Sequence, residues 1–184
     1  MTTRIKVSNS FVLTLGVALC VLVGCTSEPS SEPDATSTSS AAATAAPTPD
    51  AVEEQARHEV LAAYNGYLEA YITASATANY RTKELATYVG EPLLGQLLNN
   101  LYNMSRSGVR NEGRPTWSPT VTELRLDANE AVIQDCFDST NWNAVGGKAQ
   151  PTAQAKKYPV VLKAKRVNDK WYVYESTAQR SSTC

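Results

Sequence analysis

Histidine is nearly absent from this sequence, which has only His58 among its 184 residues. The chain also has no glycine-rich phosphate loop, no Cys-x-x-Cys pair and no His-Glu-x-x-His motif. These absences remove the usual sequence signatures of nucleotide binding, of a zinc site and of a metalloprotease. We therefore expect neither a cofactor nor a metal ion, and we expect His58 to be a surface residue near the start of a helix.

Long apolar runs are also scarce. The one such run, residues 11–23, follows the basic residues Arg4 and Lys6. About a dozen mostly apolar residues are too few for a comfortable membrane span but are typical of the core of a signal peptide. The sequence therefore predicts an exported protein.

The apolar run ends at Leu22-Val23-Gly24-Cys25. This tetrapeptide resembles the lipobox of bacterial lipoproteins. The resemblance implies that residues 1–24 are a lipoprotein signal peptide and that Cys25 receives a diacylglyceryl group, whose two acyl chains hold a protein on a membrane more firmly than one. We expect an extracytoplasmic protein, lipid-anchored at Cys25 to the outer face of the cell membrane. The alternatives are a plain signal peptide with an incidental cysteine, or an uncleaved anchor.

Aromatic and large aliphatic residues are missing from residues 26–50, which consist of Ser, Thr, Ala, Pro, Glu and Asp. Such a segment cannot bury enough surface to offset the entropy lost on ordering. We expect residues 25–50 to be the lipidated cysteine followed by a disordered tether, with a root-mean-square span of roughly 28 Å. The remainder, residues 51–184, has the size of one domain.

The chain has slightly fewer basic than acidic residues. Loss of residues 1–24 removes Arg4 and Lys6 from the 17 basic residues and none of the 18 acidic ones, which leaves a net charge of −3. This balance lacks the basic surplus that favours nucleic acid or an anionic surface. We expect no nucleic-acid partner.

Two cysteines remain in the predicted domain, because Cys20 lies in the signal peptide and Cys25 carries the lipid. In an exported domain, Cys136 and Cys184 are expected to form a disulfide. The closed loop of some 48 residues would stabilise the fold by about 4 kcal/mol on the chain-entropy model and would hold the C-terminus. A metal pair with further ligands, or two free thiols, are the alternatives.

The first half of the domain has helical periodicity. Apolar residues recur at helical spacing over residues 52–74, and Gly66 weakens this helix without ending it. A short helical piece is expected at residues 82–89. A third helix is predicted from Glu91-Pro92 to Gly108, with proline in the first turn and leucines along one stripe.

After Gly108 the apolar residues recur at every second position, which is the spacing typical of strands. Residues 121–126 and 131–137 are predicted to form one hairpin, and residues 158–167 and 171–175 another, with turns at residues 127–130 and at Asn168-Asp169. Residues 109–112, with Trp117, suggest one more strand. This order predicts an α+β fold, with N-terminal helices packed on one face of a curved antiparallel sheet of four to six strands.

The segment Ala131-Val-Ile-Gln-Asp-Cys-Phe-Asp-Ser-Thr-Asn-Trp142, with a second cysteine at Cys184, carries a more specific resemblance. Together with the element order, it resembles the cone-shaped nuclear transport factor 2-like (NTF2-like) superfamily, and in particular small lipoproteins of Gram-positive bacteria. The resemblance covers nearly the whole domain. It implies no established activity, since the superfamily contains both enzymes and non-catalytic binding modules.

Two carboxylates are weak catalytic candidates. Isomerases of the NTF2-like superfamily use a strand aspartate as base and a tyrosine hydroxyl as oxyanion partner, and Asp135 and Asp138 are of the right type. Strand alternation sends them to opposite faces, so that at most one points inward. The structural interpretation is that these aspartates end a strand, cap a turn and flank the disulfide.

Four aromatic residues are candidate ligand contacts. Tyr64, Tyr67 and Tyr71 lie on about one face of the first helix, where they either pack in the core or line a pocket with their hydroxyls. Trp142 lies in residues 138–154, between two strands. It either roofs such a pocket or sits in an extended hairpin that turns at Gly146-Gly147.

Two functions follow from these patterns. The favoured one is a non-catalytic binding or protein-association module of the cell envelope, whose partner is a small apolar molecule or an envelope protein. The alternative is an isomerase- or dehydratase-like enzyme that acts on a small apolar substrate in the cone cavity, with Asp135 or Asp138 as base. A homodimer through the open face of the sheet is a further expectation from the resemblance.

Overall fold

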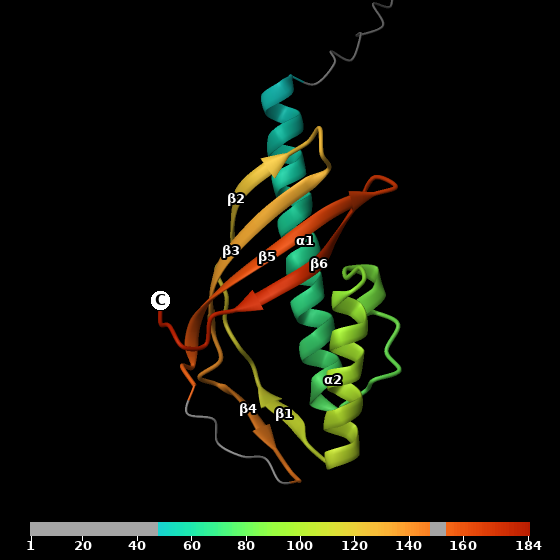
Figure 1. Ribbon diagram of the computed structural model, residues 1–184, viewed down its shortest axis with the longest axis vertical. Coiled ribbons are helices and arrows are strands. Elements are labelled where there is room, and N and C mark those ends of the chain that lie inside the picture. Colours follow the sequence, from blue (N-terminus) through green and yellow to red (C-terminus); the bar gives the residue numbers. More distant parts are fainter. Residues whose placement is uncertain (1–47, 148–153) are drawn as a thin grey trace, which may run out of the picture. The chain divides into compact units, whose positions relative to one another are not determined.

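The computed structural model describes residues 48–147 and 154–184. This part of the chain contains two α-helices, a four-stranded antiparallel sheet and a two-stranded antiparallel ribbon (Figure 1). The predicted α+β class, with helices before strands, is confirmed. The signal peptide, the predicted lipidation site Cys25 and the tether up to residue 47 lie outside the described residues. Among the helices that are described, none is long and apolar enough to cross a membrane.

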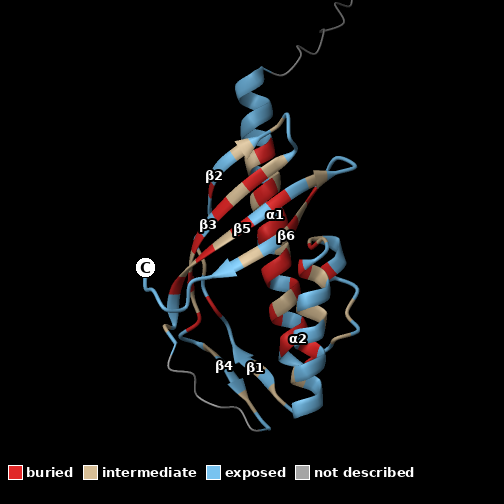
Figure 2. Cartoon of the chain, viewed as in Figure 1, coloured by how far each residue is buried: buried red, intermediate tan, exposed pale blue. Residues whose placement is uncertain are grey.

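Helix α1 spans Pro49–Ala76 and so begins three residues before the predicted start. The Thr48 hydroxyl accepts a hydrogen bond from the backbone N–H of Ala51 at 3.3 Å, and proline occupies the first turn, where its missing N–H leaves no hydrogen bond unmade. Residues up to Gln55 are exposed, and this end of α1 extends beyond the sheet (Figure 2). Gly66 lies within the helix, as predicted.

The predicted helix at residues 82–89 is not formed. Only a single 3₁₀ turn, η1 at Leu85–Thr87, is present. The residues after it bond to the sheet instead: Val173 N–H donates to Tyr88 O at 2.9 Å, and Gly90 N–H donates to Val173 O at 2.9 Å. Because these backbone groups are satisfied by the sheet, they are not available to extend a helix.

Helix α2 spans Leu93–Ser107, close to the predicted bounds. Gly108 follows it with φ 67°, and its N–H is directed to the carbonyl groups of Met104 and Ser105. A left-handed glycine of this kind ends a helix without steric strain. The predicted stop at Gly108 is confirmed.

The four-stranded sheet is an antiparallel meander in the order β2-β3-β5-β6. Its strands are β2 at Thr120–Arg125, β3 at Glu130–Asp138, β5 at Lys157–Val167 and β6 at Lys170–Ala178. Asn168 and Asp169 join β5 to β6 with φ of 49° and 61°, as a type I′ turn requires. Register shifts on two strand pairs mark irregularities of the bulge type, which bend and twist a sheet.

The two-stranded ribbon pairs β1, Arg110–Gly113, with β4, Trp142–Val145. Strand β1 was predicted. Strand β4 lies in the segment for which the sequence left two alternatives, and among the described residues its partner is β1, with Gly113 opposite Trp142. Trp117 belongs to no strand; its indole N–H donates to the Asn65 side-chain oxygen on α1 at 2.8 Å.

The hydrophobic core lies between α1 and one face of the four-stranded sheet (Figure 2). On β3 the inward positions alternate as expected for a strand, and they place Ile133, Asp135 and Phe137 on the buried side. The largest fully buried side chains of this core, apart from the aromatic ones, are aliphatic: Val60, Leu85, Val89, Leu101, Ile133, Leu162 and Val173.

Cys136 and Cys184 form the predicted disulfide, with Cα atoms 5.9 Å apart. Cys136 projects from the face of β3 opposite to Phe137, so the bond holds the C-terminal tail against the outer face of the sheet. A disulfide of this kind persists in an oxidising compartment and indicates an extracytoplasmic environment.

Candidate functional site

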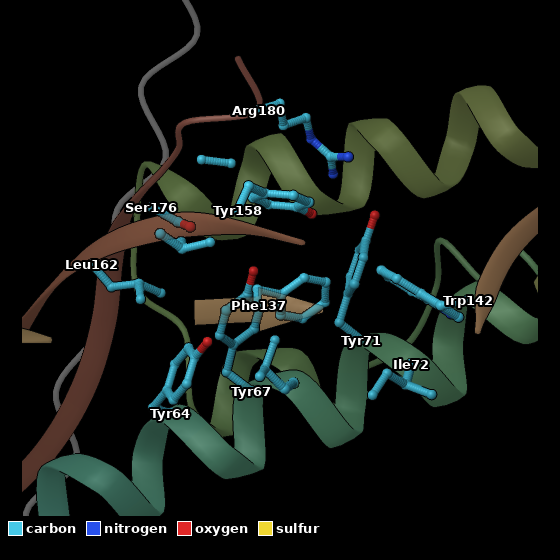
Figure 3. Close-up of a pocket in the computed structure, with 13 residues that line it drawn as sticks. Tyr64, Tyr67, Tyr71, Ile72, Phe137, Trp142, Tyr158, Leu162, Ser176 and Arg180 are labelled. Atoms are coloured by element: carbon cyan, nitrogen blue, oxygen red, sulfur yellow. The ribbon is translucent and has the colours of Figure 1, made fainter. Parts of the chain in front are cut away.

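A cavity of about 140 Å³ lies between α1 and the inner face of the sheet. Helix α1, strands β3 to β6 and the C-terminal tail all contribute to its wall, and most of the lining side chains are aromatic or aliphatic (Figure 3). The lining residues are Tyr64, Tyr67, Leu68, Tyr71, Ile72, Phe137, Trp142, Tyr158, Val160, Leu162, Ser176, Ala178 and Arg180.

The three tyrosines of α1 form one wall of this cavity. Tyr64 and Tyr67 are buried, and Tyr71 is half-buried. Their rings follow one another along the helix, with centroids 6.1 Å apart for Tyr64 and Tyr67 and 6.4 Å apart for Tyr67 and Tyr71. Spacings of three and four residues keep side chains on one helical face, so the stripe that the sequence singled out is both core and cavity wall.

Trp142 closes the cavity from β4. Its ring packs edge-on against Tyr71 of α1 and against Phe137 of β3, with centroids 6.1 Å and 6.0 Å apart. Edge-to-face contacts of this geometry add stabilisation beyond the buried area. The pairing of β4 with β1 therefore brings the indole to the wall of the cavity.

Burial keeps the tyrosine hydroxyls neutral. Loss of solvation raises the pKa of Tyr71 to about 12, and the positive charge of Arg180 works against this rise. Burial also raises the pKa of Tyr67, helped by Tyr71 and opposed by a hydrogen bond with Ser176. The cavity therefore offers uncharged hydroxyl groups on an otherwise apolar surface.

Arg180 provides the charge at one end of the cavity. Its guanidinium carbon lies 4.4 Å from the ring centroid of Tyr158, a cation–π contact. The hydroxyls of Tyr71 and Tyr158 point toward the guanidinium (Figure 3). The Tyr71 hydroxyl also donates a hydrogen bond to the side-chain oxygen of Asn100 on α2, at 2.7 Å. The site is thus amphipathic, with an apolar interior and a polar, cationic end.

Asp135 is buried on the inner face of β3 but does not line the cavity. One carboxylate oxygen accepts a hydrogen bond from the Tyr64 hydroxyl at 2.6 Å, and the other accepts one from the backbone N–H of Ser118 at 2.7 Å. The first contact raises the pKa of Tyr64 further, after the larger effect of burial. Both oxygens are therefore engaged in holding α1, β3 and the segment before β2 together.

Asp138 lies on the other face of β3, as alternation predicted, and its backbone bonds with Thr116. Its carboxylate accepts a hydrogen bond from the backbone N–H of Thr140 at 2.9 Å. Hydrogen bonds from the Thr140 side chain and backbone hold the Asp138 pKa below its usual range. This is the local turn geometry of an Asx motif, and it keeps Asp138 away from the cavity.

Several residues of the cavity were not singled out from the sequence. Phe137 and Tyr158 face each other across β3 and β5, with ring centroids 5.7 Å apart. Strand alternation alone identifies both as inward-facing, since Phe137 is two residues from Asp135. Arg180 follows the last strand, in a tail with no periodicity, and no sequence signal could have placed it at the cavity.

His58 is exposed on α1, as expected. Within residues 48–147 and 154–184, no group of three or more His, Cys, Asp or Glu side chains is arranged to hold a metal ion.

No protein-family model and no curated protein sequence matches this chain. Among solved structures, the chain is similar to the intermembrane space region of the chloroplast protein ARC6, with 10% identity, a TM-score of 0.47, and coverage of 66% of this chain and 95% of that one. It is also similar to a domain of unknown function with a cystatin-like fold from Nostoc punctiforme, with 12% identity, a TM-score of 0.40, and coverage of 74% and 81%. At these TM-scores, neither likeness assigns the chain to a family.

Proposed function

We propose that this chain is an extracytoplasmic lipoprotein, anchored through Cys25, whose NTF2-like domain binds a small apolar molecule in the aromatic cavity between α1 and the sheet. The single observation that carries the binding role is the cavity itself, about 140 Å³ of space beneath the rings of Tyr67, Tyr71 and Trp142. An apolar pocket with a few convergent polar groups is the usual form of a small-molecule site.

Binding is favoured over catalysis because of what the cavity wall contains. The lining side chains in the described part of the chain include neither a carboxylate nor a histidine, the groups that most often act as general base. The isomerase-like alternative draws some support from Asp135, which is buried and bonded to a tyrosine hydroxyl. However, Asp135 does not line the cavity, and both of its oxygens already accept hydrogen bonds.

A small ligand is also favoured over a homodimer through the sheet. The outer face of the sheet carries the ion pairs Arg125–Glu130 and Lys163–Glu175. Charged side chains are depleted at the centre of stable interfaces and are well suited to contact with water. The cavity wall, by contrast, is mostly aromatic and aliphatic.

The binding role is tested with toluene as a neutral apolar probe. Titration of the full chain, followed by NMR, is expected to shift resonances of Tyr67, Tyr71 and Trp142. Ser176→Leu fills the cavity from β6 and is expected to abolish these shifts. Thr177→Leu is the matched control, because Thr177 lies on the same strand opposite Val161 and outside the cavity, and it is expected to leave binding intact. If toluene does not bind the unmodified chain, or if Ser176→Leu binds it equally well while folded, the proposal is wrong.

A further inference from the structure

The cationic end of the cavity is held in place by the C-terminal tail. Arg180 O accepts a hydrogen bond from Ala155 N–H at 3.1 Å, and Gln179 N–H donates to Pro159 O at 2.9 Å. Four residues after Arg180 the chain is bonded to β3 through Cys184. The tail backbone is therefore fixed on both sides of Arg180, and its side chain is directed to the cavity by the fold.

Within the described residues, no acidic side chain forms an ion pair with Arg180. Five other arginines form ion pairs with acidic side chains in the described residues, namely Arg57, Arg110, Arg114, Arg125 and Arg166. Arg180 forms no such pair there, and it stacks on Tyr158 instead. Stacking on an aromatic ring orients the guanidinium. One side-chain hydrogen bond joins it to the Tyr158 hydroxyl, and its remaining N–H donors can meet an anion.

The surface around the Arg180 end of the cavity is also positively charged. Arg180, Tyr71 and Trp142 also line an adjoining groove, whose other polar residues are mainly Asn and Gln. The charged residues of that groove, within the described part of the chain, are Arg180 and Lys156. A concave surface lined by one sign of charge raises the local concentration of ions of the opposite sign.

The size of the cavity limits what enters it. An apolar cavity of about 150 Å³ binds a molecule the size of benzene. The present cavity has about 140 Å³. Its apolar interior therefore fits one ring, or an aliphatic chain of similar volume, and a polar group attached to that body would emerge at Arg180.

We propose that the ligand is a small monocarboxylic acid, whose apolar body, the size of a single ring, fills the cavity and whose carboxylate binds the Arg180 guanidinium. This inference rests on the proposed binding function and specifies its ligand class. A guanidinium presents paired N–H donors that match the two oxygens of a carboxylate. The neutral hydroxyls of Tyr71 and Tyr158 beside it add polarity without adding a competing charge.

The inference is tested with three probes that share one phenyl ring: phenylacetate, its neutral amide phenylacetamide, which has nearly the same size, and the smaller toluene. Phenylacetate is expected to bind the full chain at least about tenfold more tightly than phenylacetamide, because a hydrogen bond to a charged group contributes that much to affinity. Arg180→Gln is expected to make the two affinities equal. Arg106→Gln removes the same charge from the exposed end of α2, outside the cavity, and is expected to keep the preference.

The outcomes separate the two proposals. Toluene binding together with equal affinities for phenylacetate and phenylacetamide would overturn the carboxylate inference while leaving the binding function in place. A preference that survives in Arg180→Gln would also overturn it. If toluene does not bind, the binding function is wrong, and the inference falls with it.

Discussion

The Tyr64 hydroxyl donates a 2.6 Å hydrogen bond to the Asp135 carboxylate, and both side chains are buried between α1 and β3. These two residues are 71 positions apart in the sequence. Together with the bond from Ser118 N–H, this contact satisfies a charged group inside the core, where an unpaired charge is strongly destabilising.

Tyr64→Phe is expected to lower the free energy of unfolding by about 2 kcal/mol, because it leaves a buried carboxylate oxygen without a donor. Tyr71→Phe is the control, since its hydroxyl bonds to the uncharged side chain of Asn100 and not to a carboxylate, and it is expected to have a smaller effect. Adding Asp135→Asn to Tyr64→Phe should recover part of the loss, because the buried group is then uncharged. Urea denaturation measures the free energy of unfolding of the three variants. Equal losses of this free energy in Tyr64→Phe and Tyr71→Phe would contradict the role assigned to the Tyr64–Asp135 pair.

Gly66→Ala is expected to destabilise the protein, although alanine is the better helix former by about 1 kcal/mol. A Cβ on Gly66 would lie 2.6 Å from Cζ of Tyr88, whose ring packs against α1 at this point. Gly95→Ala in α2 is the matched control, because there the nearest atom is a flexible carboxylate oxygen of Glu91 at 3.1 Å. Thermal unfolding should show a lower midpoint for Gly66→Ala and an unchanged or higher midpoint for Gly95→Ala. A stabilised Gly66→Ala variant would show that the Tyr88 ring is readily displaced.

Stability is expected to fall as the pH rises above about 10. The raised pKa values of the cavity tyrosines mean that, above pH 10, the unfolded chain loses protons that the folded chain keeps, so stability present at lower pH is lost. For Tyr71, whose pKa is raised from 10.0 to about 12, the loss lies between these two values. At pH 11 this single group contributes a loss of about 1 kcal/mol.

Urea denaturation at pH 8, 10 and 11 measures this loss. Tyr71→Phe should show a smaller fall in stability over this pH range, because it removes one group whose pKa is raised. A stability that does not change between pH 8 and pH 11 would be inconsistent with buried tyrosine hydroxyls.

Cys184→Ser is expected to weaken phenylacetate binding more than toluene binding. Loss of the disulfide frees the end of the tail that carries Arg180, while the aromatic wall on α1 stays in place. The variant should also be less stable by about 2–4 kcal/mol, as is typical when a native disulfide is removed. Titration calorimetry with the two probes measures the change in preference. An unchanged preference would mean that the backbone bond from Ala155 to Arg180 suffices to hold the tail.

Cys25→Ser is expected to abolish lipidation and firm membrane retention. The variant lacks the thiol that is proposed to accept the diacylglyceryl group, and a chain without acyl groups has no comparable hold on a bilayer. Mass spectrometry of the mature N-terminus and membrane fractionation measure the two effects. Release of the unmodified and variant proteins to the same extent would show that Cys25 is not the anchor.

The parts of the fold that sequence predicted are those encoded by local patterns. The hairpin turn at Asn168-Asp169, the stop of α2 at Gly108 and the tyrosine stripe of α1 each depend on residues close together in the chain. The paired cysteines were predictable from their number and compartment. The α+β class followed from the change of period after residue 108.

The parts that were missed depend on contacts between distant segments. Residues 88–90 join the edge of β6 instead of extending a helix, and β4 pairs with β1 from about thirty residues earlier. Neither choice has a local signature, because an extended backbone accepts any partner that presents free hydrogen-bonding groups. Arg180 reaches the cavity only because the tail is tied down, so its role depends on the complete fold.

The position of Arg180 on the tail separates the recognition of charge from the integrity of the core. The apolar wall of the cavity comes from α1 and the sheet, and changing those residues disturbs packing that the whole domain shares. Arg180, by contrast, is exposed and lies after the last strand. A single substitution there can reverse or abolish the preference for an anion at little expense to folding. Selection, or an engineer, could therefore retune the ligand of this scaffold by editing a short terminal segment.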